Sequence, residues 1–290
     1  MKIVIASGKG GTGKTFFSVN LARILDRELL LLDCDVEEPN ANLLLKGEQI
    51  SQRDSTLLVP KVNLDLCDGC RVCADFCQFN AIAVIRGTPL IFDDLCHGCG
   101  GCVLFCPQKA MYEEPHKIGV ITHYKRSKIS LIEGRLDIGK ALAVPVIRDV
   151  KGDAEVAKHS LVLIDAPPGT SCPVVWSLSG TDLAILITEG TPFGMHDLKL
   201  AVETVREVGI PFGVVINRDG MGDDRVEKYC QQEGIPVVGK IPNDRHIATI
   251  YAQGKILVDE APRYRPLFTQ IWEEIENLAA KVGGVNERAQ

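Results

Sequence analysis

The chain has 290 residues, a length expected for two compact domains, and its composition of 46% hydrophobic and 24% charged residues is that of an ordinary soluble protein. Its formal charge of -6 gives no long-range attraction to nucleic acid or to an anionic membrane, so neither partner is expected. The first residues lack the apolar segment of a signal peptide, and no uncharged run could span a bilayer. We therefore expect a cytoplasmic protein without a membrane anchor.

The first elements predicted along the chain are a short apolar strand at 3–6, a glycine-rich loop at 8–13 and a helix at 14–25. An apolar strand at 29–32 follows and ends at Asp33. This order of strand, loop, helix and strand is that of a parallel α/β sheet.

The glycine-rich loop matches the phosphate-binding pattern G-x-x-x-x-G-K-[ST]. Its residues are Gly8, Lys9, Gly10, Gly11, Thr12, Gly13, Lys14 and Thr15. Backbone N–H groups of such a loop surround phosphates at a helix N-terminus, with Lys14 at the β- and γ-phosphates and Thr15 on Mg²⁺. ATP and Mg²⁺ are the predicted ligands, and the alternative is a glycine turn with accidental basic residues.

Cysteines then dominate the segment from about 62 to 115. Eleven cysteines in a reducing compartment do not suggest a disulfide framework, and eight of them form two matching runs with the spacing C-x2-C-x2-C-x3-C. The two halves of the segment repeat one another. We predict an inserted domain at 61–115 and a discontinuous domain made of 1–60 and 116–290.

Each run has the spacing found in bacterial two-cluster ferredoxins, where the fourth cysteine of one run binds the other cluster. The predicted ligands of one [4Fe-4S] cluster are Cys67, Cys70, Cys73 and Cys106, and those of the second are Cys77, Cys96, Cys99 and Cys102. Zinc is the alternative metal, although the doubled run and its terminal Cys-Pro favour iron–sulfur clusters.

After the insertion, α/β alternation resumes. A hairpin is predicted at 119–136, strands at 161–164, 183–188, 212–216 and 237–241, and helices at 195–208, 224–232 and 267–282. The predicted fold class is α/β, a doubly wound, mostly parallel sheet of a P-loop ATPase with an inserted small α+β ferredoxin-like domain.

Carboxylates follow two of the apolar strands. Asp33 and Asp35 come at the end of the second strand, and Asp165 ends the strand at 161–164. Carboxyl ends of parallel strands form the ligand-binding edge of doubly wound sheets, so these groups are candidates for the nucleotide site. Each could instead only cap the helix that follows.

The motif Ser-Gly-Lys-Gly-Gly-Thr-Gly-Lys-Thr resembles that of the deviant Walker A ATPases, which include MinD, ParA, Mrp-type carriers, arsenite-pump ATPases and dinitrogenase reductase. The resemblance covers nearly all of the chain outside the insertion. It implies an ATP-dependent homodimer in which Lys9 reaches the phosphates of the partner subunit.

By the same resemblance, Asp35 orients the attacking water and Asp165 holds Mg²⁺ through water in a switch II loop with the pattern Asp-x-Pro-Pro-Gly. The expected catalytic residues are thus Lys9, Lys14, Asp35 and Asp165. The adenine-side residues that the resemblance implies are Asn217, Arg218, Pro242 and Asp244. Hydrolysis is expected to be slow and to depend on dimerisation.

Three cysteines remain outside the two runs. Cys34 and Cys230 are expected to be small buried apolar residues. Cys172 resembles in position a cysteine that holds a cluster on the dimer axis of dinitrogenase reductase, but no second cysteine is found for such a site, and we expect no cluster there.

Three functions are compatible with these motifs. The favoured one is a dimeric ATPase that couples nucleotide state to electron transfer through two clusters, to or from a partner protein. An Mrp-type cluster carrier is the first alternative, although no C-x-x-C follows Cys172. A MinD- or ParA-like positioning ATPase is the second, although the tail at 268–278 has an acidic polar face. A purely structural role of the clusters explains the presence of two redox-active centres less well than electron transfer does.

Overall fold

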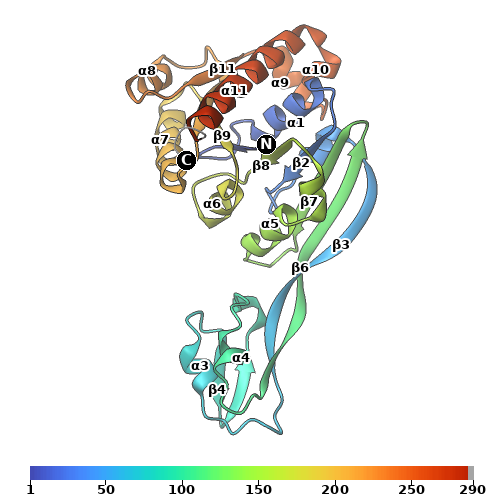
Figure 1. The fold of residues 1–290 in the computed structure, drawn as a ribbon, viewed down its shortest axis with the longest axis vertical. Coiled ribbons are helices and arrows are strands. Elements are labelled where there is room, and N and C mark those ends of the chain that lie inside the picture. Colours follow the sequence, from blue (N-terminus) through green and yellow to red (C-terminus); the bar gives the residue numbers. More distant parts are fainter. Residues whose placement is uncertain (287–290) are drawn as a thin grey trace. The chain divides into compact units, whose positions relative to one another are not determined.

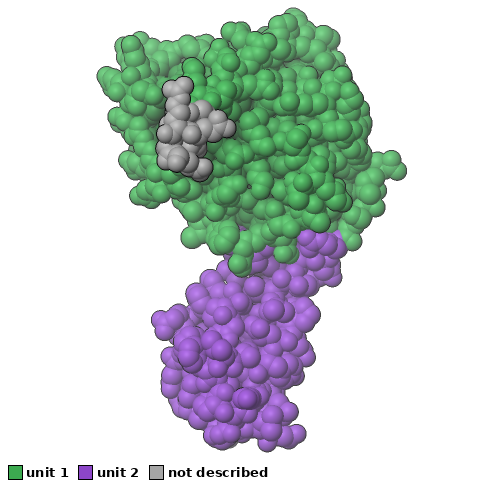
Figure 2. Space-filling model, viewed as in Figure 1, with its two compact units in different colours: residues 1–52, 121–135, 147–290 green, residues 53–120, 136–146 purple. Residues whose placement is uncertain are grey.

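The computed structural model describes residues 1–286, with side chains to residue 281. The chain forms two compact units, coloured green and purple in Figure 2. Unit 1 comprises Met1–Gln52, Ile121–Arg135 and the chain from Ile147 onward, and unit 2 comprises Arg53–Val120 and Leu136–Val146. Unit 2 contains all of the predicted insertion, 61–115, and extends beyond it at both ends.

Among the described residues, nine strands form one sheet in the order β11-β10-β9-β1-β8-β2-β7-β6-β3 (Figure 1). The pairs from β11 to β7 are parallel, as predicted. The strands are β1 (Lys2–Ala6), β2 (Leu29–Asp33), β3 (Glu48–Val62), β6 (Met111–Arg126), β7 (Ile129–Leu136), β8 (Val162–Asp165), β9 (Leu183–Glu189), β10 (Phe212–Asp219) and β11 (Val237–Pro242).

Helices cover the sheet as in a doubly wound fold. One group is built around α1, which packs against α2, α10 and α11, and a second group contains α6, α7 and α8. The helices of these groups, with α5 and α9, are α1 (Lys14–Ile24), α2 (Ala41–Leu45), α5 (Ala143–Lys151), α6 (Cys172–Leu178), α7 (Pro192–Val208), α8 (Arg225–Gln232), α9 (Arg245–Ala252), α10 (Leu257–Glu260) and α11 (Arg265–Asn286). The 3-10 turns η2 (Ala154–Lys158) and η3 (Pro262–Tyr264) complete unit 1.

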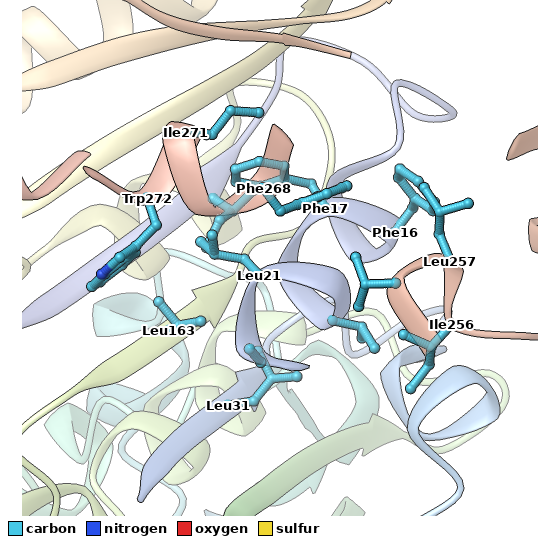
Figure 3. Close-up of a cluster of buried hydrophobic side chains, with 14 of the residues drawn as sticks. Phe16, Phe17, Leu21, Leu31, Leu163, Ile256, Leu257, Phe268, Ile271 and Trp272 are labelled. Carbon is cyan, nitrogen blue, oxygen red and sulfur yellow. The ribbon is translucent and has the colours of Figure 1, made fainter. Parts of the chain in front are cut away.

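The core of unit 1 explains why the P-loop helix stays in place. The strand residues of β2 are all buried, because a central parallel strand is covered on both faces. Phe16 and Phe17 of α1 pack against Phe268 of α11, with ring centroids 6.1 and 6.0 Å apart (Figure 3). Leu257 of α10 belongs to the same cluster. These apolar contacts anchor α1 directly behind the phosphate-binding loop.

Unit 2 is built from two repeats 29 positions apart. Helix α3 (Val72–Phe76) in the first repeat corresponds to α4 (Gly101–Leu104) in the second, and left-handed backbone recurs at Gly69 and Gly98. Between the repeats, β4 (Ile82–Ile85) and β5 (Thr88–Ile91) form an antiparallel pair, followed by the turn η1 (Asp93–Leu95). The internal repetition that the cysteine spacing predicted is therefore present in the backbone.

The main differences from the sequence analysis concern the long strands. β3 was not predicted, because most of it is exposed and carries polar residues where a buried strand would be apolar, and β6 was predicted only from residue 119 onward. The predicted hairpin is confirmed as β6 and β7, joined through Ser127 and Lys128. Among the described residues, none of the helices is both long and apolar enough to cross a membrane.

Candidate functional site

The phosphate-binding loop, residues 7–13, connects β1 to α1. Gly11 and Gly13 have φ angles of 76° and 93°, which favour glycine. A Cβ on Gly13 would lie 2.5 Å from Nδ2 of Asn217, and a Cβ on Gly8 would lie 2.0 Å from the backbone oxygen of Asp197. Because α1 begins at Lys14, the free N–H groups and positive dipole end of the helix meet this loop.

Lys14 and Thr15 lie at the start of α1 and are both buried, with 6% and 7% of their surface exposed. Burial lowers the pKa of Lys14, while the charges of Asp165 and Asp35 act in the opposite direction. A buried ammonium group needs negative charge around it, and a bound polyphosphate chain would supply that charge.

Asp165 ends β8 and lies against the start of α1. Oγ1 of Thr15 donates to Oδ2 of Asp165 over 2.5 Å, and Oγ of Ser18 donates to Oδ1 over 3.2 Å. Burial raises the pKa of Asp165 to about 6, and the hydrogen bond from Thr15 opposes this. The two residues predicted to hold Mg²⁺, far apart in sequence, are therefore neighbours in space.

Asp35 lies in the loop between β2 and α2, with its side chain partly exposed. Burial raises the pKa of Asp35 to about 6, the charge of Lys14 lowers it, and Glu38 and Glu37 raise it. A carboxylate with a pKa near neutrality and access to solvent can orient water by accepting a hydrogen bond.

Asp33, which was a candidate for the nucleotide site, holds the backbone of that loop. Its carboxylate oxygens accept hydrogen bonds from the backbone N–H groups of Asp35, Asn40 and Ala41, over 3.1, 3.0 and 2.9 Å. Burial, and next the charge of Asp165, raise the pKa of Asp33 well above its ordinary value. Asp33 is also in register with Glu133 of β7 and with Asp165 of β8, so three neighbouring strands carry a row of carboxylates.

Lys9 points toward acidic groups of its own chain. Its Nζ lies 3.7 Å from Oε2 of Glu189 and 4.0 Å from Oδ2 of Asp197. Glu189, at the end of β9, has only 5% of its side chain exposed and also pairs with Arg218 over 2.7 Å. Glu189 was not among the predicted site residues, although it ends its strand as Asp165 does.

The four residues expected on the adenine side lie in different settings. Nδ2 of Asn217 donates to the backbone oxygen of Thr12 over 2.7 Å, which brings the end of β10 against the phosphate-binding loop. Pro242 ends the neighbouring strand β11, and Asp244 caps α9 by accepting the N–H of His246 over 2.7 Å. Nη2 of Arg218 likewise donates to the backbone oxygen of Gly11 over 3.4 Å, so Asn217 and Arg218 both contact the loop, whereas Asp244 serves as a helix cap.

In unit 2, four cysteines line one pocket. They are the predicted ligands of the first cluster, Cys67, Cys70, Cys73 and Cys106. Burial raises the pKa of Cys73, and the negative charges of Cys67 and Cys106 raise it further. The cysteines that line this pocket come from both repeats of the unit.

The cysteines of the other set lie close enough for their charges to act on one another. Burial raises the pKa of Cys102 to about 11, and the charges of Cys96 and Cys99 add to this effect. The pKa of Cys96 is likewise raised by burial and then by the charges of Cys99 and Cys77. Within the described residues, no group of three or more His, Cys, Asp or Glu side chains is arranged to hold a single metal ion.

Two of the three remaining cysteines are buried, as predicted. Cys34 is fully buried and Cys230 has 1% of its surface exposed, so the prediction of small buried apolar residues is confirmed for both. Burial raises the pKa of Cys230 to about 11. Cys172 is exposed and is the first residue of α6.

The chain was compared with solved structures. It resembles the septum site-determining protein MinD complexed with Mg-ADP from Pyrococcus horikoshii, with a TM-score of 0.58 and 20% identity over 97% of this chain and 98% of that one. The cell division ATPase MinD of Pyrococcus furiosus has the same TM-score and 22% identity, over 96% of this chain and 98% of that one. At these identities the likeness shows the fold.

Sequence relatives and a family model extend the comparison. An uncharacterized protein of Methanocaldococcus jannaschii is 31% identical over 96% of this chain and 97% of its own length. The iron-sulfur cluster carrier protein of Pyrococcus abyssi is 24% identical over 84% of this chain and 74% of its own length. Residues 3–258 match the CobQ/CobB/MinD/ParA nucleotide binding domain. The chain therefore belongs to the CobQ/CobB/MinD/ParA family of nucleotide-binding domains.

Proposed function

We propose that the protein is an ATP-binding and ATP-hydrolysing switch that works as a homodimer. In this proposal, nucleotide state controls electron transfer, to or from a partner protein, through two [4Fe-4S] clusters in unit 2. The observation that carries the proposal is that one chain combines a phosphate-binding loop with eight cysteines gathered into two sets of four.

The nucleotide site has the groups that phosphoryl transfer to water requires, namely positioning groups and positive charge. Lys14 would neutralise the β- and γ-phosphates, and Thr15 with Asp165 would hold Mg²⁺. Asp35 would orient the attacking water, and Lys9 would act on the phosphates of the partner subunit. Slow hydrolysis gated by dimerisation follows, because each site is incomplete until the second subunit supplies its lysine.

The residues of unit 2 fit two iron–sulfur clusters by donor type and grouping. Burial raises the pKa of Cys73, Cys96 and Cys102, so their thiolate forms are costly without a positive partner. Iron in a cluster supplies that partner, and the bound clusters would supply one-electron redox chemistry. Backbone N–H groups of Ala81 and Ala110 donate to sulfur of Cys77 and Cys106, each over 3.3 Å, and such bonds favour the thiolate.

The proposal is tested by EPR-monitored redox titration of anaerobically purified protein, without nucleotide, with Mg-ADP and with a nonhydrolysable ATP analogue. Light scattering reports the oligomer in the same samples. We expect two [4Fe-4S] signals whose potentials shift when the ATP analogue induces the dimer. Clusters that are present but indifferent to nucleotide would contradict the electron-transfer role, and protein without iron would contradict the cluster assignment.

A second candidate is supported by the relative from Pyrococcus abyssi, whose name is iron-sulfur cluster carrier protein. Sites with four cysteine ligands leave no iron position open, which argues for retained rather than transferred clusters. Incubation of the cluster-loaded protein with a cluster-free ferredoxin discriminates the two. ATP-dependent transfer of iron and sulfide to that acceptor would favour the carrier role.

A positioning role is supported by the fold shared with MinD. The exposed acidic residues Glu273, Glu274 and Glu276 of α11 do not favour an anionic lipid surface. Sedimentation with anionic vesicles in the presence of ATP tests this candidate, and co-sedimentation would support it.

A further inference from the structure

A lysine from one helix caps the end of another in unit 1. Nζ of Lys151, the last residue of α5, donates to the backbone oxygens of Trp176, Ser177 and Ser179, over 2.7, 2.8 and 2.6 Å. These carbonyls lie at the C-terminal end of α6, where a helix has acceptors without partners and a negative dipole end. The guanidinium of Arg148, also on α5, lies 5.1 Å from the Trp176 ring.

Helix α6 directly follows the switch II loop, residues 165–169. The backbone N–H of Gly169 in this loop donates to the backbone oxygen of Ser7 over 3.1 Å. The backbone N–H of Ala166 donates to the backbone oxygen of Ile5 over 3.0 Å. The loop is therefore attached to the phosphate-binding segment on one side and to α6 on the other. Any movement of the loop must be accommodated by α6.

Helix α5 also belongs to unit 2. The limit between the two units falls between Val146 and Ile147, inside this helix. In unit 2, the loop that precedes α5 is held by Lys140. Its Nζ donates to Oδ1 of Asp94 over 2.6 Å and lies 2.9 Å from Nε2 of His116. Asp94 is two residues before Cys96.

We propose that Lys151 is a positioning residue for the switch II loop, and that α5 transmits changes in this loop to the segment around Cys96. The inference rests on the proposed function, because it supplies the connection between nucleotide state and the cysteine-bearing unit. Three charge-assisted hydrogen bonds resist separation of α5 from α6. A shift of α6 on ATP binding therefore displaces α5, and Lys140 passes that displacement to Asp94.

Substitutions at position 151 distinguish a lysine that only stabilises the fold from one that positions the switch II loop. Burial lowers the pKa of Lys151 to about 8, so the site already opposes its charge. Lys151→Met keeps the length and apolar stem but removes the donors, whereas Lys151→Arg keeps the charge and the donors. Lys158 is exposed and pairs with Glu155, so Lys158→Met is the matched control.

The experiment measures ATP hydrolysis and amide hydrogen exchange of the full chain, with ADP and with a nonhydrolysable ATP analogue. For Lys151→Met we expect kcat to fall about tenfold with KM changed less than about threefold, because positioning is lost and binding is kept. The nucleotide-dependent exchange difference at residues 136–146 should disappear in Lys151→Met and return in Lys151→Arg. The control should match the wild type.

A wild type without a nucleotide-dependent exchange difference at 136–146 would overturn the inference, as would a difference that persists in Lys151→Met. If Lys151→Met does not fold, Arg148→Gln serves in its place, because it removes only the contact with Trp176, and a reduced exchange difference is then expected. Failure of this inference is distinguishable from failure of the proposed function, since iron content and EPR signals test the latter independently.

Discussion

Thr15 and Asp165 are joined by a 2.5 Å hydrogen bond across 150 positions of sequence, at the point where α1 begins and β8 ends. Both side chains are buried. They meet because β8, which ends at Asp165, pairs with β1, and β1 leads through the phosphate-binding loop to Thr15. A hydroxyl and a carboxylate beside a phosphate-binding loop are the oxygen ligands that Mg²⁺ prefers. Removal of one of these two groups should therefore weaken Mg²⁺ binding while nucleotide binding without Mg²⁺ is kept.

We predict that Asp165→Asn lowers ATP hydrolysis at least about a hundredfold, because the metal loses its negative partner while the phosphate-binding loop is unchanged. Mg²⁺ should no longer increase nucleotide affinity, whereas affinity measured without Mg²⁺ should stay close to that of the wild type. Isothermal titration of ADP with and without Mg²⁺ measures this difference.

Ser18→Ala is the control for Asp165→Asn, because it removes only the longer hydrogen bond to Asp165, 3.2 Å. We expect less than about a threefold change in hydrolysis from loss of this peripheral contact. An unchanged Mg²⁺ effect in Asp165→Asn would show that Asp165 does not serve the metal.

The pH dependence of Mg²⁺ stabilisation follows from the same site. Burial raises the pKa of Asp165 and of Asp35 to about 6, above the unfolded value of about 3.9. For a carboxyl whose pKa is raised by folding, the stabilising contribution is complete below about pH 4 and is lost as the pH rises through about 6. Mg²⁺ competes with these protons and should restore stability above pH 6.

We therefore expect Mg-ADP to raise Tm by clearly more at pH 7.5 than at pH 5, because the carboxylates must lose protons to bind the metal. Differential scanning fluorimetry across this range measures the shift, with ADP alone as the reference at each pH. A Tm gain that is the same at both pH values would contradict the assignment, and Asp165→Asn should flatten the profile.

The fold of unit 1 was largely predictable because its strands are short, apolar and followed by amphipathic helices. The leucines of β2 gave a clear signal, since a buried parallel strand is apolar on both faces. β3 gave no such signal, because it has an exposed face and its partner β6 is distant in sequence. Tertiary pairing, rather than local propensity, determines that strand.

The candidate site was predictable only where a motif fixes both residue type and spacing. The phosphate-binding loop and the eight cysteines meet that condition. Glu189, at the end of β9, and Glu133, within β7, do not, because a single acid in a strand has many possible roles. Only the sheet order brings Glu133 beside Asp33, and only the fold brings Glu189 beside Lys9. The cap formed by Lys151 was not predictable, since the carbonyls that it binds carry no sequence signal.

We predict that Cys73→Ala and Cys102→Ala each lower the iron content of the purified protein from about eight atoms to about four per chain, because each removes a ligand of one four-iron cluster. Iron and acid-labile sulfide analysis with EPR measures the loss. The two variants should retain different signals, since the remaining clusters lie in different surroundings.

Cys172→Ala and Cys230→Ala are the controls and should keep about eight iron atoms, because neither cysteine belongs to the two sets. Zinc in place of iron, or loss of all iron from a single variant that stays folded, would contradict two independent [4Fe-4S] sites.

The core that holds α1 behind the phosphate-binding loop should be sensitive to truncation. Phe17 is fully buried against Phe268, so Phe17→Ala should destabilise the protein by about 3–5 kcal/mol through lost burial and cavity formation. Phe193 is 79% exposed, and Phe193→Ala should change stability by less than about 0.5 kcal/mol. Urea unfolding measures both, and equal effects would contradict the packing described for α1.

Lys9 faces carboxylates of its own chain, with its Nζ 3.7 Å from Oε2 of Glu189 and 4.0 Å from Oδ2 of Asp197. If it acts on the partner subunit, Lys9→Ala and Asp35→Asn should each abolish hydrolysis alone, because the first lacks the donated lysine and the second lacks the group that orients water.

An equal mixture of the two variants should then recover about a quarter of wild-type activity, because half of the dimers are mixed and each mixed dimer has one complete site. That site combines Asp35 of the Lys9→Ala subunit with Lys9 of the Asp35→Asn subunit. Recovery should rise with protein concentration, as association requires. A mixture that stays inactive although native mass spectrometry detects mixed dimers would mean that Lys9 serves its own subunit, and the switch would then have to be sought in the contact between Lys9 and Glu189.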